Sequence, residues 1–317
     1  MRVLFWGTPE FAAPPLRALL GEGFDVIGVV TQPDRPQGRS RSALVPSPIK
    51  RIALEESLPV LQPEKPRGAE FVESIRAAEP DVSVVVAYGH ILPRDVIDLP
   101  RLGTLNIHAS LLPQWRGAAP IQAAIRAGQS ETGVTIMRMV TQLDAGPILL
   151  QVPTPIVPDE TYGELQLRLS ELGALALIEA LSLLDIGEID ERPQDDTLAT
   201  LAPKIEREDA RLDWTQPAAS VAAVVRAFDP KPGAFTTLDG AEVKLFGVRA
   251  ASSLEIPDGT AFPPGGTVLA LDDAGALVAC GDGVVRITDA QVAGKRRLSF
   301  GELARGRGIR VGDRFGV

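Results

Sequence analysis

Strand-like and helix-like segments alternate through the first two-thirds of the chain, and this alternation limits the possible folds more than any other feature. Segments such as Val3–Trp6, Val82–Ala87 and Thr104–His108 have strand character, and segments of helical composition separate them. The Val82–Ala87 run is apolar apart from Ser83, which is typical of a strand buried on both faces of a parallel sheet. The alternation therefore predicts an open, doubly wound α/β sheet.

The expected helices carry recognisable start signals. Ser47 followed by Pro48 is typical of an N-cap with proline at the first helical position, and it predicts a helix to about residue 57. Pro14 and Pro15 fit near the start of another helix rather than in its interior. The remaining elements expected in this part are helices over 10–20, 69–78, 118–127 and 161–184 and strands over 26–30 and 134–139.

The character of the sequence changes after about residue 185. Residues 188–206 are polar and contain proline, which indicates a linker, and a helix is expected over 216–228. Short apolar runs punctuated by Gly, Pro and Asp follow, which favours a small β-barrel. The strands expected there lie over 243–248, 267–271, 276–280 and 284–287. We predict a catalytic α/β domain over 1–187, a linker over 188–206 and a β domain over 207–317.

Composition excludes several classes of protein. With one cysteine, Cys280, the 317-residue chain can form no intramolecular disulfide and no cysteine-rich zinc site. Its two histidines, His90 and His108, argue against a histidine-rich metal centre, and we expect no metal. No apolar run is long enough to span a membrane, and the N-terminus lacks the apolar core of a signal peptide. We expect a cytoplasmic protein.

Basic residues are concentrated in two stretches. The net charge of −9 argues against general coating of nucleic acid. Arg35, Arg39, Arg41, Lys50 and Arg51 nevertheless form one basic stretch, and residues 294–314 form a second. A solvated surface would explain either stretch alone, but two of them in an acidic protein favour a polyanionic partner.

Asn106 and His108 are the most informative pair of polar residues. They stand two apart at the end of a predicted strand, so both side chains lie on one face of the sheet, at the edge where such sheets bind ligands. An Asn amide can stabilise an oxyanion and a His can move a proton near neutral pH. Asp144 follows the next strand and is a candidate to orient His108. A purely structural histidine remains possible from these residues alone.

Other catalytic motifs are missing from the sequence. There is no Gly-x-Ser-x-Gly nucleophile motif, no Walker A sequence and no Gly-x-Gly-x-x-Gly after the first strand. These absences disfavour a serine hydrolase, a P-loop enzyme and a dinucleotide-binding enzyme. Group transfer by direct attack of a substrate amine fits the residues present.

The segment 106–122 resembles the signature of the folate-dependent formyltransferases. It reads Asn-Ile-His-Ala-Ser-Leu-Leu-Pro followed by Gln-Trp-Arg-Gly-Ala-Ala-Pro-Ile-Gln. The resemblance extends nearly end to end, and it is strongest to members that act on methionyl-tRNA. The other matching segments are 5–12, 31–36, 38–39, 46–50, 85–89, 131–137, 226–228 and 293–295.

This resemblance implies a Rossmann-like formyltransferase domain and an OB-like C-terminal barrel. It also implies transfer of a formyl group from 10-formyltetrahydrofolate to the α-amino group of methionyl initiator tRNA. His108 would then handle protons and help polarise the formyl carbonyl, and Asn106 would stabilise the oxyanion. Asp144 would hold His108 in its productive state and help the amine lose its proton.

Binding residues are also implied by the resemblance. The expected folate-binding stretch is Ser110, Leu111, Leu112 and Pro113, together with Ala87, Tyr88, Gly89, His90, Ile91 and Leu92 around the pterin end. The expected tRNA contacts are Arg39 and Arg41 in a loop over 32–46, and Lys295, Arg296 and Arg297 in the β domain. The resemblance implies a monomer.

Three other functions remain open at this point. The first is a formyltransferase for a small amine, such as a glycinamide ribonucleotide or an amino sugar nucleotide, because the catalytic core would be the same. The second is a non-catalytic tRNA-binding module, which the intact Asn106, His108 and Asp144 argue against. The third is hydrolysis of the formyl donor, which would leave the basic stretches unexplained.

Overall fold

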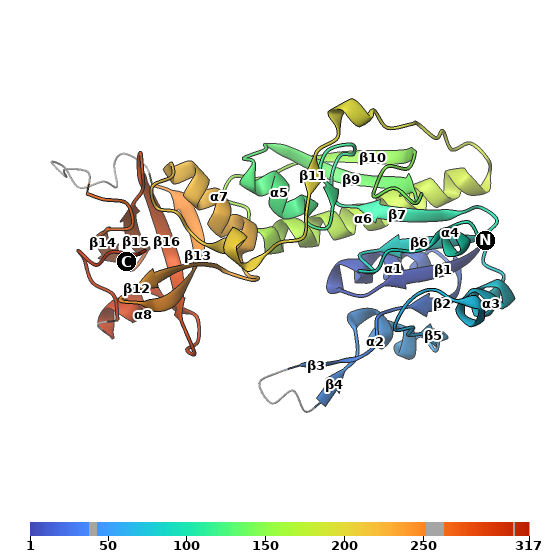
Figure 1. Cartoon of the computed structure of the whole chain (residues 1–317), viewed down its shortest axis with the longest axis horizontal. Coiled ribbons are helices and arrows are strands. Elements are labelled where there is room, and N and C mark those ends of the chain that lie inside the picture. Colours follow the sequence, from blue (N-terminus) through green and yellow to red (C-terminus); the bar gives the residue numbers. More distant parts are fainter. Residues whose placement is uncertain (38–42, 252–262, 307, 317) are drawn as a thin grey trace. The chain divides into compact units, whose positions relative to one another are not determined.

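The structure is a computed structural model that describes residues 1–37, 43–251, 263–306 and 308–316 (Figure 1). The chain divides into two compact units that are discontinuous in sequence. The first unit comprises Met1–Pro120, Thr132–Thr154 and Gln166–Pro203. The second unit comprises Ile121–Glu131, Pro155–Leu165 and Lys204–Val317.

A seven-stranded sheet forms the centre of the first unit, with the order β10-β9-β7-β6-β1-β2-β5. The pairings of β1 with β2 and β6, of β6 with β7 and of β2 with β5 are parallel, and β9 runs antiparallel to β7. The sheet is therefore parallel-rich, as predicted, with a reversed strand beside β7. The strands are β1 (Arg2–Gly7), β2 (Asp25–Val30), β5 (Val60–Leu61), β6 (Val82–Val86), β7 (Thr104–His108), β9 (Glu131–Arg138) and β10 (Ile148–Pro155).

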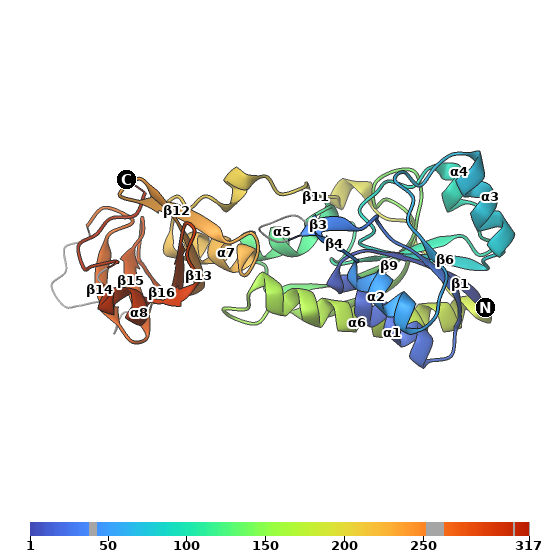
Figure 2. The same cartoon turned by 90° about the horizontal axis from the view of Figure 1, so that it is seen from below.

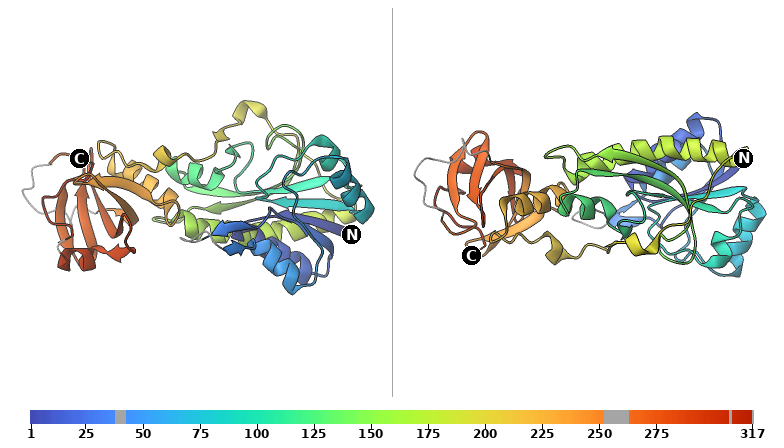
Figure 3. Two further views of the ribbon diagram at one scale, coloured as in Figure 1. Left: turned by 60° about the horizontal axis from the view of Figure 1, so that its bottom comes forward. Right: turned by 90° about the horizontal axis from the view of Figure 1, so that it is seen from above.

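Helices cover both faces of this sheet, so the fold is doubly wound (Figure 2). On one face Leu4, Trp6 and Val85 pack with Val72 and Ile75 of α3 and with the residues of α4. On the other face lie α1, α2 and α6, and Figure 3 shows α6 running along the strands. The helices of the first unit are α1 (Ala13–Gly21), α2 (Pro48–Glu55), α3 (Ala69–Ala78), α4 (Arg94–Ile97) and most of α6 (Tyr162–Asp185), with a short 3₁₀ turn over Glu10–Ala12. All but the first residue of α5 (Pro120–Arg126) belongs to the second unit.

Two short pairings complete the first unit. β3 (Arg35–Gln37) pairs antiparallel with β4 (Ala43–Val45), on either side of the stretch that the structure does not describe. β8 (Arg116–Gly117) pairs in parallel with β11 (Leu201–Ala202). The second pairing shows that part of the predicted linker lies in a two-stranded sheet with the segment that follows β7.

The second unit contains an antiparallel sheet around its own core. The strand order is β12-β13-β16-β15-β14, and β17 pairs with β16. Trp214, Phe228, Leu245, Phe300 and Phe315 lie in one buried cluster. The elements are η3 (Arg207–Ala210), α7 (Ala218–Phe228), β12 (Ala234–Leu238), β13 (Ala241–Ala250), β14 (Val268–Asp272), β15 (Gly275–Ala279), β16 (Val284–Val292), β17 (Leu298–Ser299) and α8 (Phe300–Arg305).

The sheet of the second unit is not closed by any pairing between its described strands. β12 and β14 stand at the two ends of the order, and no pairing among the described residues joins them. The antiparallel β domain expected from the sequence is therefore present, and its closure into an OB-like barrel stays a prediction. Among the described helices, none is both long and apolar enough to cross a membrane.

The N-cap of α2 offers a test of local stability. The Ser47 hydroxyl accepts a hydrogen bond from the Lys50 backbone N–H at 3.0 Å and shares another with the Thr31 hydroxyl at 2.7 Å. Replacing Ser47 with Ala should destabilise the start of α2 by about 1 kcal/mol. The first α2 amides should then exchange hydrogen roughly fivefold faster. Ser182→Ala, in the exposed interior of α6, is the control and should not destabilise its helix. Unchanged exchange in Ser47→Ala would contradict the assigned cap.

Candidate active site

Asn106 and His108 lie on one face of β7, at its carboxyl end. Asn106 stands beside Val85 of β6 on one side and Met137 of β9 on the other, and His108 stands beside Thr135. Val85 belongs to the cluster beneath α3 and α4, so both polar side chains are on that face of the sheet. Helical cover ends here, and the carboxyl ends of the parallel strands form the edge expected to bind ligands.

The imidazole of His108 is almost fully buried between two hydrogen-bond acceptors. Its Nε2 lies 3.0 Å from the Trp115 backbone oxygen, and its Nδ1 lies 3.7 Å from the Asp144 carboxylate oxygen Oδ2. Burial lowers the pKa of His108, while the negative charge of Asp144 and the Trp115 carbonyl act to raise it. The structure therefore brings His108 and Asp144 together, with burial and charge opposing each other at one ring.

Asp144 occupies a tight turn between β9 and β10. Its backbone adopts φ 47°, in the left-handed region that non-glycine residues rarely occupy. Its Oδ2 accepts a hydrogen bond from the Gly117 backbone N–H at 2.8 Å. A Cβ on Gly146 would lie 1.8 Å from the Arg138 carbonyl oxygen, so only glycine fits there. The turn is pressed against β9, and the carboxylate is directed to His108.

Among the three candidate catalytic residues, Asn106 has a side chain without a hydrogen-bond partner in the described part of the chain. Its amide makes no hydrogen bond to any residue within the described part of the chain, and it is only partly buried. Both its donor and its acceptor atoms are available to a ligand at the end of β7. Asn106 and His108 together can donate to an oxygen that gains negative charge and accept a proton from a nearby amine.

Sequence reasoning missed Gln194, which lies in the predicted linker. Its Nε2 donates to the backbone oxygens of Asp144 and Gly146, each at 2.8 Å. Its Oε1 accepts from Arg116, through Nε at 3.1 Å and Nη2 at 2.8 Å. Arg116 also pairs with Asp196 at 2.7 Å. A polar, aperiodic segment gives no sequence signal for such contacts, apart from the presence of an amide side chain.

The expected folate stretch 110–113 is held in place by a small hydrogen-bond network. Thr135 Oγ1 donates to the Ser110 carbonyl at 2.7 Å and accepts from the Leu112 N–H at 3.1 Å. Gln151 Nε2 donates to the Leu112 carbonyl at 2.8 Å. Ser110 Oγ donates to the Gln114 carbonyl at 2.6 Å, which closes a turn around Leu111 and Pro113. The stretch is thus fixed to β9 and β10 beside His108.

The second expected folate segment, 87–92, leaves β6 as an irregular loop. Ala87 and Gly89 have φ values of 47° and 87°. The Tyr88 carbonyl accepts from the Thr8 hydroxyl at 3.1 Å and from Gln32 Nε2 at 2.9 Å. Burial raises the pKa of Tyr88 to about 12, and its hydroxyl has no partner within the described residues.

The same loop presents both apolar surface and backbone donors. Ile91 is 86% exposed, whereas Leu92 is buried. The backbone N–H groups of residues 89–92 donate no hydrogen bond to any residue that the structure describes. His90 contacts the Tyr88 ring, with centroids 5.6 Å apart, and does not join His108 and Asp144. An exposed apolar side chain beside free backbone donors fits a flat heteroaromatic ligand with polar edges.

The expected tRNA contacts have different surroundings. Arg39 and Arg41 lie outside the described residues. Lys295 and Arg296 are exposed, and Arg296 lies 3.6 Å from Glu302.

Arg297 is instead committed to its own unit. It pairs with Asp229 at 3.1 Å and Asp289 at 2.9 Å and stacks over Phe246, with 4.4 Å from its guanidinium carbon to the ring centroid. Two carboxylates therefore compensate the positive charge of Arg297, and its guanidinium packs on an aromatic ring. A structural role in the second unit explains Arg297 more directly than contact with a phosphate.

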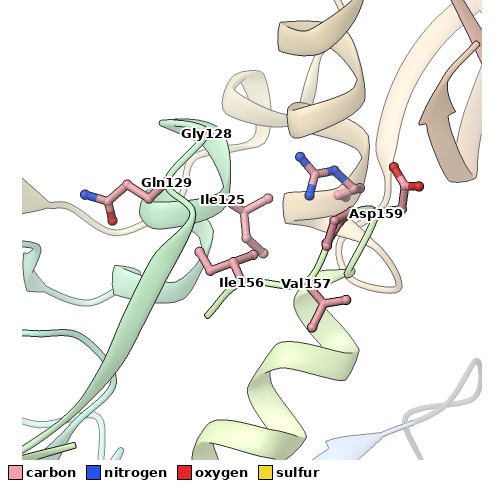
Figure 4. Close-up of a pocket in the computed structure, with 8 residues that line it drawn as sticks. Ile125, Gly128, Gln129, Ile156, Val157 and Asp159 are labelled. Atoms are coloured by element: carbon pink, nitrogen blue, oxygen red, sulfur yellow. The ribbon is translucent and has the colours of Figure 1, made fainter. Parts of the chain in front are cut away.

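A pocket of about 270 Å³ lies in the second unit, and none of the predicted catalytic, folate-binding or tRNA-binding residues lines it (Figure 4). The Arg226 Nε is buried there without a partner among the described residues, and burial lowers the pKa of Arg226. The nearest charges, Asp159 and Glu160, partly offset that effect. Across the described residues, no group of three or more His, Cys, Asp or Glu side chains is arranged to hold a metal ion.

Comparisons with known proteins identify the family of the chain. The formyl transferase family signature matches residues 1–181, and that of the formyl transferase C-terminal domain matches residues 204–308. The chain belongs to the formyl transferase family. It is 48% identical to the methionyl-tRNA formyltransferase of Pseudomonas fluorescens (strain SBW25) over 97% of this chain and 94% of that protein. It is 47% identical to the methionyl-tRNA formyltransferase of Stutzerimonas stutzeri (strain A1501), over 97% and 95%.

Solved structures share the fold at lower identity. HypX from Aquifex aeolicus, in complex with tetrahydrofolic acid, is 23% identical with a TM-score of 0.65, over 96% of this chain and 46% of HypX. The sugar 3N-formyl transferase WlaRD is 17% identical with a TM-score of 0.64, over 93% of this chain and 99% of WlaRD. At these identities the comparison establishes the fold alone.

The opposition between burial and charge at His108 gives a direct prediction. In Asp144→Asn the negative charge that raises the pKa of His108 is lost, so that pKa should fall below its wild-type value. An NMR titration of the two histidines measures this, with His90 assigned from His90→Gln. Asp195→Asn removes a carboxylate that caps a 3₁₀ turn in the same unit and should leave the titration unchanged. An equal or higher pKa in Asp144→Asn would rule out the pairing.

Proposed function

We propose that this protein transfers a formyl group from 10-formyltetrahydrofolate to the α-amino group of methionyl initiator tRNA. One observation carries the proposal: methionyl-tRNA formyltransferases match it at 46–48% identity over 97% of the chain. The amine nitrogen attacks the formyl carbon, the bond from that carbon to the folate nitrogen breaks, and the folate nitrogen takes up a proton. Because tRNA is charged in the cytoplasm, we place the protein there, acting as a monomer.

The residues at the end of β7 divide the chemistry between them. The neutral amine is already a nucleophile, so the site needs to position it, stabilise charge and move a proton. The free amide of Asn106 donates to the formyl oxygen as negative charge develops. His108 takes part in proton transfer. Burial favours its neutral form, and the Asp144 carboxylate favours its charged form. Asp144 sets that balance and helps the attacking amine lose its proton.

The formyl donor fits the loop 87–92 and the stretch 110–113. The free backbone donors of residues 89–92 suit the polar edge of a pterin ring, and exposed Ile91 can lie against its apolar face. The 110–113 stretch, fixed by Thr135 and Gln151, forms the other wall in this proposal. We treat the folate as a substrate, and no step requires a metal.

The tRNA contacts are proposed for two regions. Arg39 and Arg41 belong to the loop that would meet the acceptor end, where unpaired bases can be read. Lys295 and Arg296 are exposed in the second unit and suit phosphate contacts, whereas Arg297 is engaged by Asp229 and Asp289. We keep residues 207–317 as the proposed OB-like, tRNA-binding domain, with 188–206 joining it to the catalytic domain over 1–187.

The first experiment is a formyl-transfer assay with methionyl initiator tRNA and 10-formyltetrahydrofolate. The wild type should be active, His108→Ala should lose about 10²–10⁴-fold in kcat, and Asn106→Ala about 10²–10³-fold. The control is Lys204→Ala, an exposed charge that the proposal assigns no role. Formyl transfer to a small amine, such as a glycinamide ribonucleotide or an amino sugar nucleotide, with none to the charged tRNA, would overturn the proposed substrate and keep the reaction.

Arg39 tests the tRNA assignment separately from the chemistry. Arg39→Ala should raise the KM for initiator tRNA by roughly 10-fold, as expected for the loss of about 1–3 kcal/mol of contact energy, and leave folate binding unchanged. Salt dependence of KM should weaken at the same time, because one cation fewer meets the polyanion. Unchanged tRNA kinetics in Arg39→Ala would remove this loop from the proposed interface.

A further inference from the structure

We infer that Gln194 is a positioning residue for Asp144 and, through it, for the protonation of His108. The inference rests on the proposed function for its consequence in catalysis, but its physical basis is independent of the substrate. Gln194 lies 50 residues beyond Asp144 in the chain and contacts neither substrate-facing candidate. It holds the backbone on both sides of the Asp144 turn.

The Gln194 amide is fully used, and its orientation is forced by its partners. Backbone oxygens can only accept, so the Nε2 must face Asp144 and Gly146. A guanidinium can only donate, so the Oε1 must face Arg116. A carboxylate could not donate to the two carbonyls, and an ammonium could not accept from Arg116. Among side chains of this length, glutamine alone satisfies all these partners.

The turn needs such an external restraint. A non-glycine residue in the left-handed region, as at Asp144, is strained and persists only where its surroundings enforce that conformation. Gly146 is crowded against the Arg138 carbonyl, which limits how the turn can relax. By holding the carbonyls of Asp144 and Gly146 together, Gln194 fixes the turn in the conformation that directs the carboxylate at His108.

The chain just after Gln194 also contacts the residues that hold Asp144 and His108. Ala202 pairs with Gly117 in the β8–β11 sheet, and a Cβ on Gly117 would lie 2.4 Å from the Ala202 carbonyl oxygen. The N–H of Gly117 is the donor to Asp144. Thr200 Oγ1 accepts from the Trp115 N–H at 2.9 Å, and the Trp115 carbonyl is the acceptor at His108. Ala202 and Thr200 therefore support the groups that face the two imidazole nitrogens of His108.

Small displacements of the carboxylate have large effects here. Charges interact more strongly in a buried site than in water, and the His108 ring is almost completely excluded from solvent. If the Asp144 turn relaxes, the carboxylate moves away from Nδ1 and its effect on His108 weakens. The pKa of His108, already lowered by burial, should then fall further.

The test uses the full chain with Gln194→Leu and Gln194→Met, which are neutral and of similar volume. Both should lower the pKa of His108 in the same direction as Asp144→Asn, by NMR titration. In the formyl-transfer assay kcat should fall by roughly 10²-fold, as for a misplacement of about 1 Å, with KM for both substrates nearly unchanged. The methionine variant keeps the space filled if leucine compromises folding.

The matched control is Thr197→Val in the same segment. The Thr197 hydroxyl donates to Asp195 and makes no contact with the Asp144 turn, so kcat and the His108 titration should stay at wild-type values. A wild-type His108 titration in both Gln194 variants would overturn the inference, as would a loss of activity carried wholly by KM. A lowered His108 pKa in a protein that formylates no methionyl-tRNA would sustain the positioning role and refute the proposed function.

Discussion

The pairing of a carboxylate with a buried imidazole is the central interaction of the candidate site in the first unit. Asp144 lies 3.7 Å from His108, whose ring is almost fully buried, so water screens their interaction only weakly. Burial favours the neutral ring and the carboxylate favours the charged ring, so the two effects oppose each other. Such a balance depends on distance, so the surrounding backbone must hold both groups still.

Three segments that are distant in sequence supply that rigidity. Asn106 and His108 lie at the end of β7. The sheet fixes their positions, because β7 is hydrogen-bonded to β6 on one side and to β9 on the other. The turn after β9 carries Asp144. The segment that contains Gln194 follows α6 within the first unit and contacts both the Asp144 turn and β8. Asn106 and His108 thus stand on a strand paired on both sides, and Asp144, whose charge acts on His108, stands on a restrained turn.

Sequence patterns predicted the regular elements well and the supporting contacts poorly. α3 and β7 have the predicted bounds, because strand-like and helix-like segments alternate clearly in this part of the sequence. The alignment of Asn106 with His108 follows from the two-residue repeat of a strand. Gln194 was not predicted, because its role depends on backbone carbonyls brought near by tertiary folding. The ion pairs of Arg297 with Asp229 and Asp289 were not predicted either, since Asp229 lies 68 residues away and the sequence does not show how β16 brings Asp289 to Arg297.

The contacts of Gln194 with the Asp144 turn and of β11 with β8 set the minimum length at which the first unit could be transplanted. A chain cut after α6 would retain every strand of the seven-stranded sheet together with Asn106, His108 and Asp144. It would lack Gln194 and the β11 partner of Gly117. A fusion that joins this sheet to a different substrate-binding domain must therefore carry the chain through residue 203. The residues that hold Asp144 and Gly117 extend beyond the last strand and helix of the sheet.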